Sequence, residues 1–591
     1  MLDELGNPLN EFWVAVMATQ MGKSLMLQIS QAYKMKEQPS PMLFVTDTKD
    51  NAAKYSRERL DTMIRDNELL KRIIEDTKGR KADTILLKKY LGGYLRLVGA
   101  NSPSGLISST IKDLYLDEVD AYKLSAGQMG DPIQLAIRRT SEYDNRQICM
   151  TTSPGDEGSS RIWPYFENTD QRYFRVPCTH CDEGQPLLWG GPEVDYGMKW
   201  QNDDPSTAHY LCVHCHKKIY NIDKYKFLPQ GQWKKTFPER INKPGFHINK
   251  LYSLSETAKW EKLVEEWLQA VRSQRQGDSH HVKVFINTVR AELYKPSFGL
   301  PPQEKLLERV KDYYSPQLKS ILQKVVFVTA GIDTQDNRLE MAVKGWCVGE
   351  ESILLRYEVF EGNPALEFVW NTLDYALMEP FNHPLGFPLY ISAVAIDTGG
   401  HQTDHVYSFV RDRLARRLKS GVVQRFYATK GANTSGKPII PNKPSFNNKG
   451  NIPLYFIGTD TAKQVIMDRL KIEWNKEIKA EEPHPGYMHF HSCADITYIQ
   501  GLLSEKKVLK RVNGLHIPVW EPVPGQANEP LDCEVENLFA FRISKANLIK
   551  MNESMKELST RLAQGTLFDK SKEEEKGTHK ENDGWVNKWK K

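Results

Sequence analysis

The chain has 591 residues, too many for a single hydrophobic core, so its length predicts two to four domains. Charged residues make up 26% and hydrophobic residues 40%, as in an ordinary globular protein, and a net charge of +5 is only a weak pointer to nucleic acid. No apolar run approaches 18 residues and no signal-peptide pattern opens the chain, which argues against a membrane or secreted protein. The eight cysteines, four of them in two C-x-x-C pairs, do not resemble a disulfide framework.

The first part of the chain alternates strand-like and helical segments. Strands are predicted at 11–18, 41–47, 93–100, 111–118 and 146–154, and helical patterns cover 23–38 and 52–76. Such alternation predicts a parallel sheet flanked by helices.

A candidate phosphate-binding loop lies between the first strand and the first helix. In such a loop, backbone N–H groups at a helix N-terminus surround phosphates, a lysine reaches the β- and γ-phosphates, and a hydroxyl holds Mg²⁺. Gly22, Lys23 and Ser24 match its end, whereas Met17 stands where the pattern has its first glycine. The segment taken alone fits a surface turn equally well.

A second nucleotide motif supports the prediction of an ATP site. The strand at 111–118 ends in Asp117 and Glu118, which suit a metal-holding acid and an acid that orients the attacking water. Taken alone, this pattern also fits a strand that runs into an acidic helix cap. The segment "TTSP" at 151–154 fits a coupling element that senses the γ-phosphate, or a simple turn.

Two cysteine pairs predict a structural zinc site within a loop-rich stretch at 176–220. Pairs two residues apart suit the edges of a tetrahedral Cys₄ site, and four thiolates leave no ligand position open for catalysis. The predicted ligands are Cys178, Cys181, Cys212 and Cys215. Neighbouring histidines offer alternative ligands, namely His180, His214 and His216.

The second half predicts a further sheet. A helical segment near 258–275 precedes three closely spaced strands at 325–333, 338–347 and 351–362, which indicate an antiparallel meander. Beyond them come a strand at 389–400, a basic helix at 405–420, a helix at 528–543 and a charged tail from about 546.

Three carboxylates of this half form a candidate nuclease site. Asp333 and Asp397 end two of the strands, and Asp532 lies on the helix at 528–543. Three such acids suit two Mg²⁺ or Mn²⁺ ions that cleave phosphodiesters, as in an RNase H-like nuclease, although each acid alone fits a strand-end or helix cap. The basic helix offers phosphate contacts or a solvated face through Arg411, Arg413, Arg416 and Arg417.

The combination resembles the large terminase subunit of tailed bacteriophages, specifically the lambda-like (GpA) family. The matching segments run from about residue 11 to 545 and include "GANSPSGL", "LYLDEVDAY", "YLCVHCHKKI", "PGFHINKLYS", "FINT", "AGIDTQDNRLE", "AIDTGGHQTDHVY", "GTDTAK" and "NEPLDCEVENLFAFR". The resemblance implies an α/β chain with a P-loop ASCE-type ATPase domain, a zinc-knuckle insertion and an RNase H-like nuclease domain. The expected divisions are 1–175 (ATPase), 176–220 (zinc knuckle), 221–320 (connecting region), 321–545 (nuclease) and 546–591 (tail).

The resemblance also implies roles and partners. Gly22, Lys23 and Ser24 would bind ATP, Asp117 its metal, and Glu118 would be the catalytic acid; Asp333, Asp397 and Asp532 would cut DNA. The expected assembly is a homo-oligomeric ring on the portal of an empty head in the host cytoplasm, acting on double-stranded DNA with no membrane partner. An arginine within or between subunits is also expected, with candidates Arg138, Arg139 and Arg146.

One departure and two alternatives complete the interpretation. Family members carry a segment before the first strand that contacts adenine and a small terminase subunit, and only about ten residues precede that strand here, so both contacts are unassigned. A helicase–nuclease or recombinase would use the same acids. A zinc-dependent DNA-binding scaffold with inactive nucleotide motifs is the non-enzymatic alternative, against which Lys23, Asp117 and Glu118 argue.

Overall fold

The computed structural model describes residues 1–75, 83–191, 194–311, 316–446, 452–512 and 515–563. The chain forms two compact units, the first comprising 1–274, 278–299 and 506–521, and the second 275–277, 300–505 and 522 onward. Within the described ranges, no helix is both long and apolar enough to cross a membrane.

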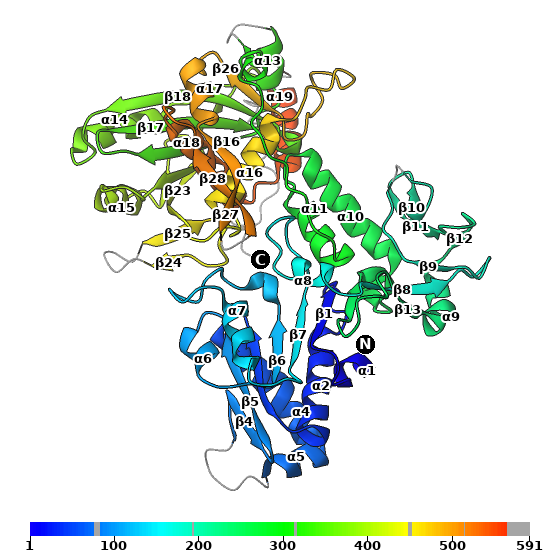
Figure 1. The fold of residues 1–591 in the computed structure, drawn as a ribbon. Coiled ribbons are helices and arrows are strands. Elements are labelled where there is room, and N and C mark those ends of the chain that lie inside the picture. The colour runs from blue at the N-terminus through cyan, green and yellow to red at the C-terminus, as the bar shows by residue number, and fades with distance from the viewer. Residues whose placement is uncertain (76–82, 192–193, 312–315, 447–451, 513–514, 564–591) are drawn as a thin grey trace, which may run out of the picture. The chain divides into compact units, whose positions relative to one another are not determined.

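A mostly parallel sheet organises the first unit (Figure 1). Its neighbours follow the order β13-β8-β14-β1-β7-β6-β2-β5-β4-β3, with β9 paired to β8. The strands are β1 (Phe12–Met17), β2 (Pro41–Thr46), β3 (Asp83–Thr84), β4 (Leu87–Tyr90), β5 (Gly93–Gly99), β6 (Asp113–Asp117), β7 (Gln147–Thr152), β8 (Arg172–Pro177), β9 (Gly184–Pro186), β13 (Gln232–Lys235) and β14 (Gly245–Ile248). Since β14, β1, β7, β6 and β2 are parallel, the loops that follow them gather at one edge.

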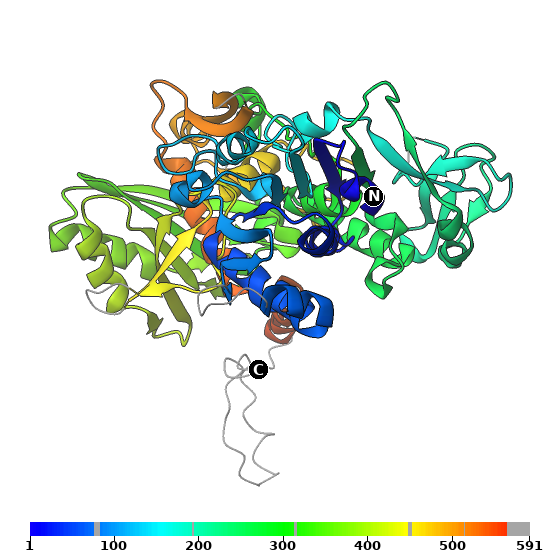
Figure 2. The same cartoon turned by 60° about the horizontal axis from the view of Figure 1, so that its bottom comes forward.

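Helices cover both faces of this sheet. On one face, side chains of β1, β2 and β6 pack with α2 (Lys23–Glu37), α3 (Lys49–Tyr55), α4 (Asp61–Asp66) and α5 (Glu68–Glu75). The other face packs with α6 (Pro103–Ile107), α7 (Pro132–Ile137) and α8 (Trp163–Glu167). The first helix, α1 (Leu2–Gly6), lies beside α2 (Figures 1 and 2).

The helical pattern at 52–76 is not one helix. A π-helical turn, η1 (Ser56–Leu60), joins α3 to α4, and the chain leaves the helical conformation at Asn67. There the Asn67 side chain accepts hydrogen bonds from the N–H groups of Leu69 and Leu70 and so begins α5. The last predicted residue, Asp76, lies outside the described residues.

The stretch predicted as loop-rich contains a small sheet. Strands β10 (Gly197–Gln201), β11 (Asp204–Leu211) and β12 (Lys218–Ile219) stand out at the end of the unit that carries β8 and β13 (Figures 1 and 2). The remaining helices of this unit are α9 (Lys224–Phe227), α10 (Trp260–Arg275) and α11 (His280–Phe285). Their apolar residues share one core with β8, β10 and β11.

The second unit is built on a mixed sheet in the order β15-β26-β18-β17-β16-β21-β23-β25-β24, with β22 paired to β23. The predicted meander is present: β16 (Phe327–Thr334), β17 (Arg338–Trp346) and β18 (Ser352–Glu361) are antiparallel neighbours. The other strands are β15 (Val310–Lys311), β21 (Ala393–Asp397), β22 (Ala415–Arg417), β23 (Val423–Gly431), β24 (Ser445–Phe446), β25 (Pro453–Ile457) and β26 (Met488–His491), and β19 (Phe381–Asn382) pairs with β20 (Pro388–Leu389) apart from this sheet.

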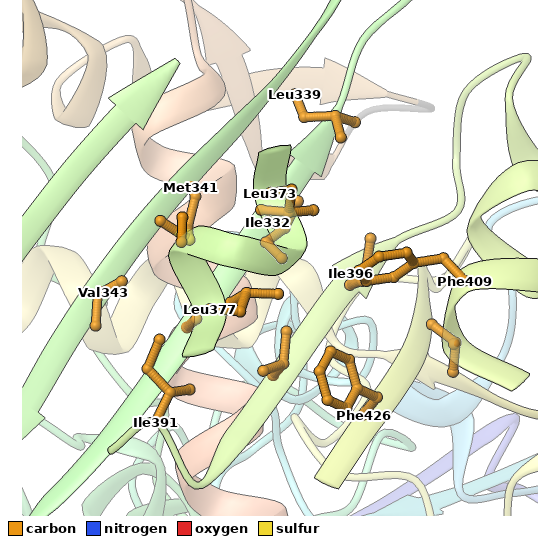
Figure 3. Close-up of a cluster of buried hydrophobic side chains, with 14 of the residues drawn as sticks. Ile332, Leu339, Met341, Val343, Leu373, Leu377, Ile391, Ile396, Phe409 and Phe426 are labelled. Atoms are coloured by element: carbon orange, nitrogen blue, oxygen red, sulfur yellow. The ribbon is translucent and has the colours of Figure 1, made fainter. Parts of the chain in front are cut away.

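The two faces of this sheet differ. Alternate residues of β16, β17 and β21, among them Ile332, Met341 and Ile396, pack in an apolar core with α14 (Glu367–Met378) and α15 (Thr403–Arg411), as Figure 3 shows. The opposite face receives α18 (Glu529–Ser544). Other elements of the second half are α12 (Gln303–Leu307), α13 (Pro316–Leu322), α16 (Thr459–Leu470), α17 (Ile496–Leu502), the hairpin β27 (Glu505–Val512)–β28 (Leu515–Pro522) and α19 (Leu548–Ala563).

Two predictions of the second half are corrected here. The basic helix ends at Arg411, and Arg413 and Arg416 both donate to the Asp374 carboxylate instead of presenting a row of free charges. The predicted tail from 546 contains α19, and the residues beyond 563 lie outside the described part of the chain.

We predict that Gly331→Ala loosens the packing of α18 on β16. A Cβ at this position would lie 2.1 Å from the Cys533 carbonyl oxygen and 2.6 Å from the Asn537 nitrogen, so backbone must move. Overpacking of this kind costs about 1–3 kcal/mol. Thermal unfolding should show a lower transition than in the control Gly184→Ala, whose Cβ meets open space. Equal transitions in the two variants would contradict the packing described.

Candidate functional sites

The loop after β1 has the backbone geometry of a helix N-terminus open to an anion. Gly22 takes the left-handed conformation at φ 88° and caps α2, which begins at Lys23. Gln20, two residues earlier, also has a positive φ, of 60°. The N–H groups of this first turn have no intrahelical partners, which is the arrangement that favours phosphate.

Asp117 is buried at this edge of the sheet, and both oxygens of its carboxylate accept hydrogen bonds. Strand alternation puts it on the α2 face with Tyr115, and it is only 6% exposed. Its two oxygens accept hydrogen bonds from Ser24 Oγ at 3.1 Å and Thr151 Oγ1 at 2.7 Å. Burial raises the pKa of Asp117, against which the Thr151 hydrogen bond acts. One carboxylate therefore joins the first turn of α2 to the ends of β6 and β7.

Glu118 and Lys23 form the second half of this network. Lys23 Nζ lies 2.9 Å from Glu118 Oε1 and donates to Ser153 Oγ at 2.8 Å. Glu118 Oε2 accepts from Thr152 Oγ1 at 2.9 Å, and Glu118 itself has the left-handed φ of 56°. A non-glycine residue is uncommon in this conformation. The Glu118 side chain is 44% exposed, so water reaches it.

Sequence reasoning named the segment 151–154 but not its contacts. Besides binding Lys23, Ser153 donates to the Met17 carbonyl at 2.9 Å. The residue that departs from the loop pattern therefore takes part through its backbone, which any side chain permits. A strand-end threonine pair opposite a strand-end acid pair in parallel neighbours is the signal that could have predicted these bonds.

The four predicted cysteines come together as one cluster. Their sulfur atoms all lie within 4.8 Å of one another, with Cys178 and Cys215 at 3.8 Å and Cys181 and Cys212 at 3.9 Å. Sulfurs that hold Zn²⁺ at about 2.3 Å in a tetrahedron are spaced by nearly these distances. The residues therefore fit zinc.

The neighbouring histidines do not compete for this position. His180 Nε2 lies 2.8 Å from the Lys218 carbonyl oxygen, and His216 Nδ1 lies 2.9 Å from that of Asp195. The backbone N–H of His180 points to the Cys178 sulfur at 3.4 Å, and the backbone N–H of His214 points to the Cys212 sulfur at 3.3 Å. Donors aimed at sulfur stabilise thiolates, as expected of a metal knuckle.

The three aspartates of the second unit share one face of its sheet. Gly331 faces α18, so Asp333, two residues on, points to the same side. The parallel pairing of Ile332 with Ile396 puts Asp397 level with Asp333 on the next strand. Asp532 is on the first turn of α18, the helix that covers this face.

Asp333 is buried, at 3% exposed, whereas Asp397 is half-buried and the Asp532 side chain is 29% exposed. Burial raises the pKa of Asp333 to about 7, with Asp532 and Asp397 adding to the shift. The pKa of Asp532 is raised to about 6 by burial, against the Lys463 ammonium. Within the described residues, the four cysteines are the only group of three or more ligand residues whose atoms all lie within 4.8 Å of one another. The carboxylate oxygens of the three aspartates are therefore spaced more widely than that. A site for two ions about 4 Å apart needs ligands spaced more widely than a site for one ion.

Further side chains at this site carried no role in the sequence analysis. Lys463 Nζ lies 3.5 Å from Asp532 Oδ1 and 2.6 Å from Glu505 Oε1, and Asn528 donates to Asp532 Oδ2 at 2.7 Å. Glu536, one helical turn after Asp532, is 3% exposed and accepts from Thr429 Oγ1 at 2.7 Å. The i, i+4 spacing in α18 is the signal that could have indicated Glu536.

Two family models and two curated relatives match most of the chain. A family model described as phage terminase large subunit gpA, ATPase domain, matches residues 1–233, and terminase large subunit gpA, endonuclease domain, matches 243–553. The terminase large subunit of Escherichia phage lambda is 30% identical over 551 residues, covering 90% of this chain and 82% of the relative. That of Enterobacteria phage P21 is 27% identical over 585 residues, covering 94% and 87%. A solved large terminase from a thermophilic bacteriophage is similar at a TM-score of 0.38 and 12% identity, covering 92% of this chain and 95% of that one.

We predict that chelation of the metal unfolds the cysteine-bearing segment. The four sulfurs tie β8 and β9 to β11 and β12, and without a cation between them thiolates at about 4 Å repel. Limited proteolysis should then cut within 176–220, while the fold of the second unit stays resistant. Cys212→Ser should be cut without a chelator. Metal analysis that finds no zinc in the purified chain would contradict the assignment.

The raised pKa of Asp333 predicts a pH-dependent stability in metal-free buffer. Its folded pKa of about 7 exceeds the unfolded value of 3.8, so its contribution to stability is lost as the pH rises from 4 to 7. Asp333→Asn removes the ionisation and should raise the thermal transition by about 2–4 °C per kcal/mol recovered. The gain should be larger at pH 8 than at pH 5. A gain that does not change with pH would contradict the buried position of this acid.

Proposed function

The chain belongs to the phage terminase large subunit gpA family, and from this we propose that it is the motor subunit that packages viral DNA. It carries the ATPase domain and the endonuclease domain of that family. Hydrolysis of ATP at the first site would drive double-stranded DNA into an empty head, and the second site would cut concatemeric DNA.

For the first site, the supporting observation is the network around Asp117. Lys23 would bind the phosphates, Ser24 and Asp117 would hold Mg²⁺, and Glu118 would orient water and accept its proton. Lys23 already bonds Glu118 and Ser153, so a phosphate that draws Lys23 away would release both. This exchange links nucleotide occupancy to the loop after β7.

For the second site, the support is the convergence of Asp333, Asp397 and Asp532 on one sheet face. Divalent Mg²⁺ or Mn²⁺ held there would supply a water of lowered pKa and stabilise the leaving oxygen. Lys463 would balance the negative charge of Asp532. The cysteine cluster, with four ligands and no open position, suits structural Zn²⁺.

The proposed assembly is a homo-oligomeric ring on the portal of the procapsid in the host cytoplasm, with double-stranded DNA in its channel. A small terminase subunit would bring the chain to its DNA. The proposed division into ATPase (1–175), zinc knuckle (176–220), connecting region (221–320) and nuclease (321–545) follows the positions of the sites. In the sheet of the first unit, β14, at Gly245–Ile248, lies next to β1, so the connecting region also contributes to the ATPase fold.

We predict that the two activities separate by mutation. Glu118→Gln or Lys23→Ala should lower ATP turnover at least about 10²-fold and leave Mn²⁺-dependent plasmid nicking within twofold of the original chain. Asp333→Ala should do the reverse. Lys36→Ala, on the exposed end of α2, and Asp336→Asn, on the exposed turn after β16, are the matched controls.

ATP turnover that survives Lys23→Ala would contradict the assignment of the first site. Nicking that survives Asp333→Ala would contradict the second. Loss of both activities in a variant that keeps the thermal unfolding of the original chain would contradict the proposed separation of the two sites.

A further inference from the structure

A cavity of about 410 Å³ opens beside the two acids at the end of β6. Asp117 and Glu118 form one wall, and the opposite wall comes from the end of β2, from α3 and from η1. The full lining is Phe44, Thr46, Asp47, Asn51, Lys54, Tyr55, Glu58, Arg59, Asp117, Glu118 and Ala121. The volume is within the range of small-ligand sites.

Two cations of this lining are not engaged by the protein's own acids. Lys54 and Arg59 are exposed, and within the described residues neither makes a hydrogen bond or ion pair. Of the acids near them, Asp47 accepts from Asn51 at 2.7 Å and Asp117 is bound by Ser24 and Thr151. An exposed guanidinium without an ion pair, next to Asp117 and Glu118, is suited to bind an anion. Arg presents its N–H donors in a planar fork that matches the oxygens of a phosphate.

The helix that carries Arg59 changes from α-helical to π-helical hydrogen bonding around this residue. The five residues Ser56–Leu60 form a π-helical turn between α3 and α4, with Ser56 and Leu60 buried against the sheet. Such a turn carries an extra residue in the helix and is frequent at functional sites. It holds two arginines, of which Arg59 lines the cavity and Arg57 does not.

The arginines suggested by the sequence lie at the other edge of the sheet. Arg146 donates to Glu11 at 2.7 and 3.0 Å, just before the first residue of β7, and the Arg139 carbonyl accepts from the N–H of Ile111, before β6. Strand β6 separates them from Asp117 by its five residues, about 13 Å at 3.3 Å per residue. Their backbones therefore lie at the opposite end of β6 from the acid pair.

We propose that Arg59 is the arginine that contacts the γ-phosphate of ATP held at Lys23 of the same chain. The inference rests on the proposed ATPase function. Water oxygen attacks the γ-phosphorus, its proton goes to the Glu118 carboxylate, and the bond to the β,γ-bridging oxygen breaks with its electron pair left on ADP. Arg59 neutralises the charge that builds on the γ-phosphoryl oxygens. Lys54, on the same wall, adds positive potential to the cavity.

The test compares Arg59→Ala with Arg57→Ala, its neighbour on the same turn. Arg59→Ala should lower kcat for ATP hydrolysis about 10³-fold, as loss of an arginine on a transferring phosphoryl group does. It should also weaken binding of ATPγS about tenfold while leaving ADP binding unchanged, because only the triphosphate reaches Arg59. Arg57→Ala should stay within twofold in all three measurements. An Arg59→Ala chain with the turnover of Arg57→Ala, or with ATPγS and ADP weakened equally, would overturn the proposal.

Mixing experiments decide whether Arg59 acts within its own chain. An equimolar mixture of Lys23→Ala and Arg59→Ala chains should show no more ATP turnover than the two variants alone. Recovery of turnover in the mixture would place the arginine between subunits and overturn the same-chain contact. Turnover that persists in Lys23→Ala alone would overturn the proposed ATP site itself, which separates that failure from a failure of the Arg59 inference.

Discussion

The geometry of the candidate nucleotide site depends on one buried carboxylate. Asp117 has both oxygens bonded, to Ser24 in the first turn of α2 and to Thr151 in the strand β7. These bonds form because β1, β7 and β6 are adjacent and parallel, so their carboxyl ends coincide. A hydroxyl, an acid and a lysine from distant parts of the sequence are thereby held within hydrogen-bond reach. The side chain of Glu118 is then held by Lys23 on one oxygen and by Thr152 on the other.

In the second unit, adjacent parallel strands again bring acids together at their carboxyl ends, but the third group comes from a helix. There, the parallel pair β16–β21 brings Asp333 and Asp397 level, and the third acid comes from a helix that lies directly on the strand at Gly331. The absence of a side chain at that glycine sets the distance between α18 and the sheet, and hence the position of Asp532. Burial of the acids raises the pKa of Asp333 and Asp532, a cost that bound cations would offset.

The strands and the metal ligands could be predicted from the sequence where a local pattern was enough to identify them. The apolar strand patterns and the C-x-x-C spacing are local signals, and the structure has a strand at each predicted segment and one cluster of the four cysteines. The other strands of both sheets were not predicted. The single helix predicted at 52–76 was wrong for a local reason, the new helix start at Asn67, whereas the basic helix was wrong because of a partner far along the chain. Arg413 and Arg416 read as one helix face, yet Asp374 binds both and the chain turns into β22. The contacts of Lys463 and the cavity at Arg59 also required tertiary proximity, which no spacing in the sequence encodes.

The central claim is that ATP hydrolysis on this chain moves DNA. The most direct measurement is the amount of double-stranded DNA that becomes resistant to added nuclease when the chain, a small terminase subunit and empty procapsids are mixed with ATP. The account predicts protected DNA with ATP and none with a non-hydrolysable analogue or with the Glu118→Gln chain. Equal protection with the analogue would contradict it, because DNA would then enter or bind without hydrolysis.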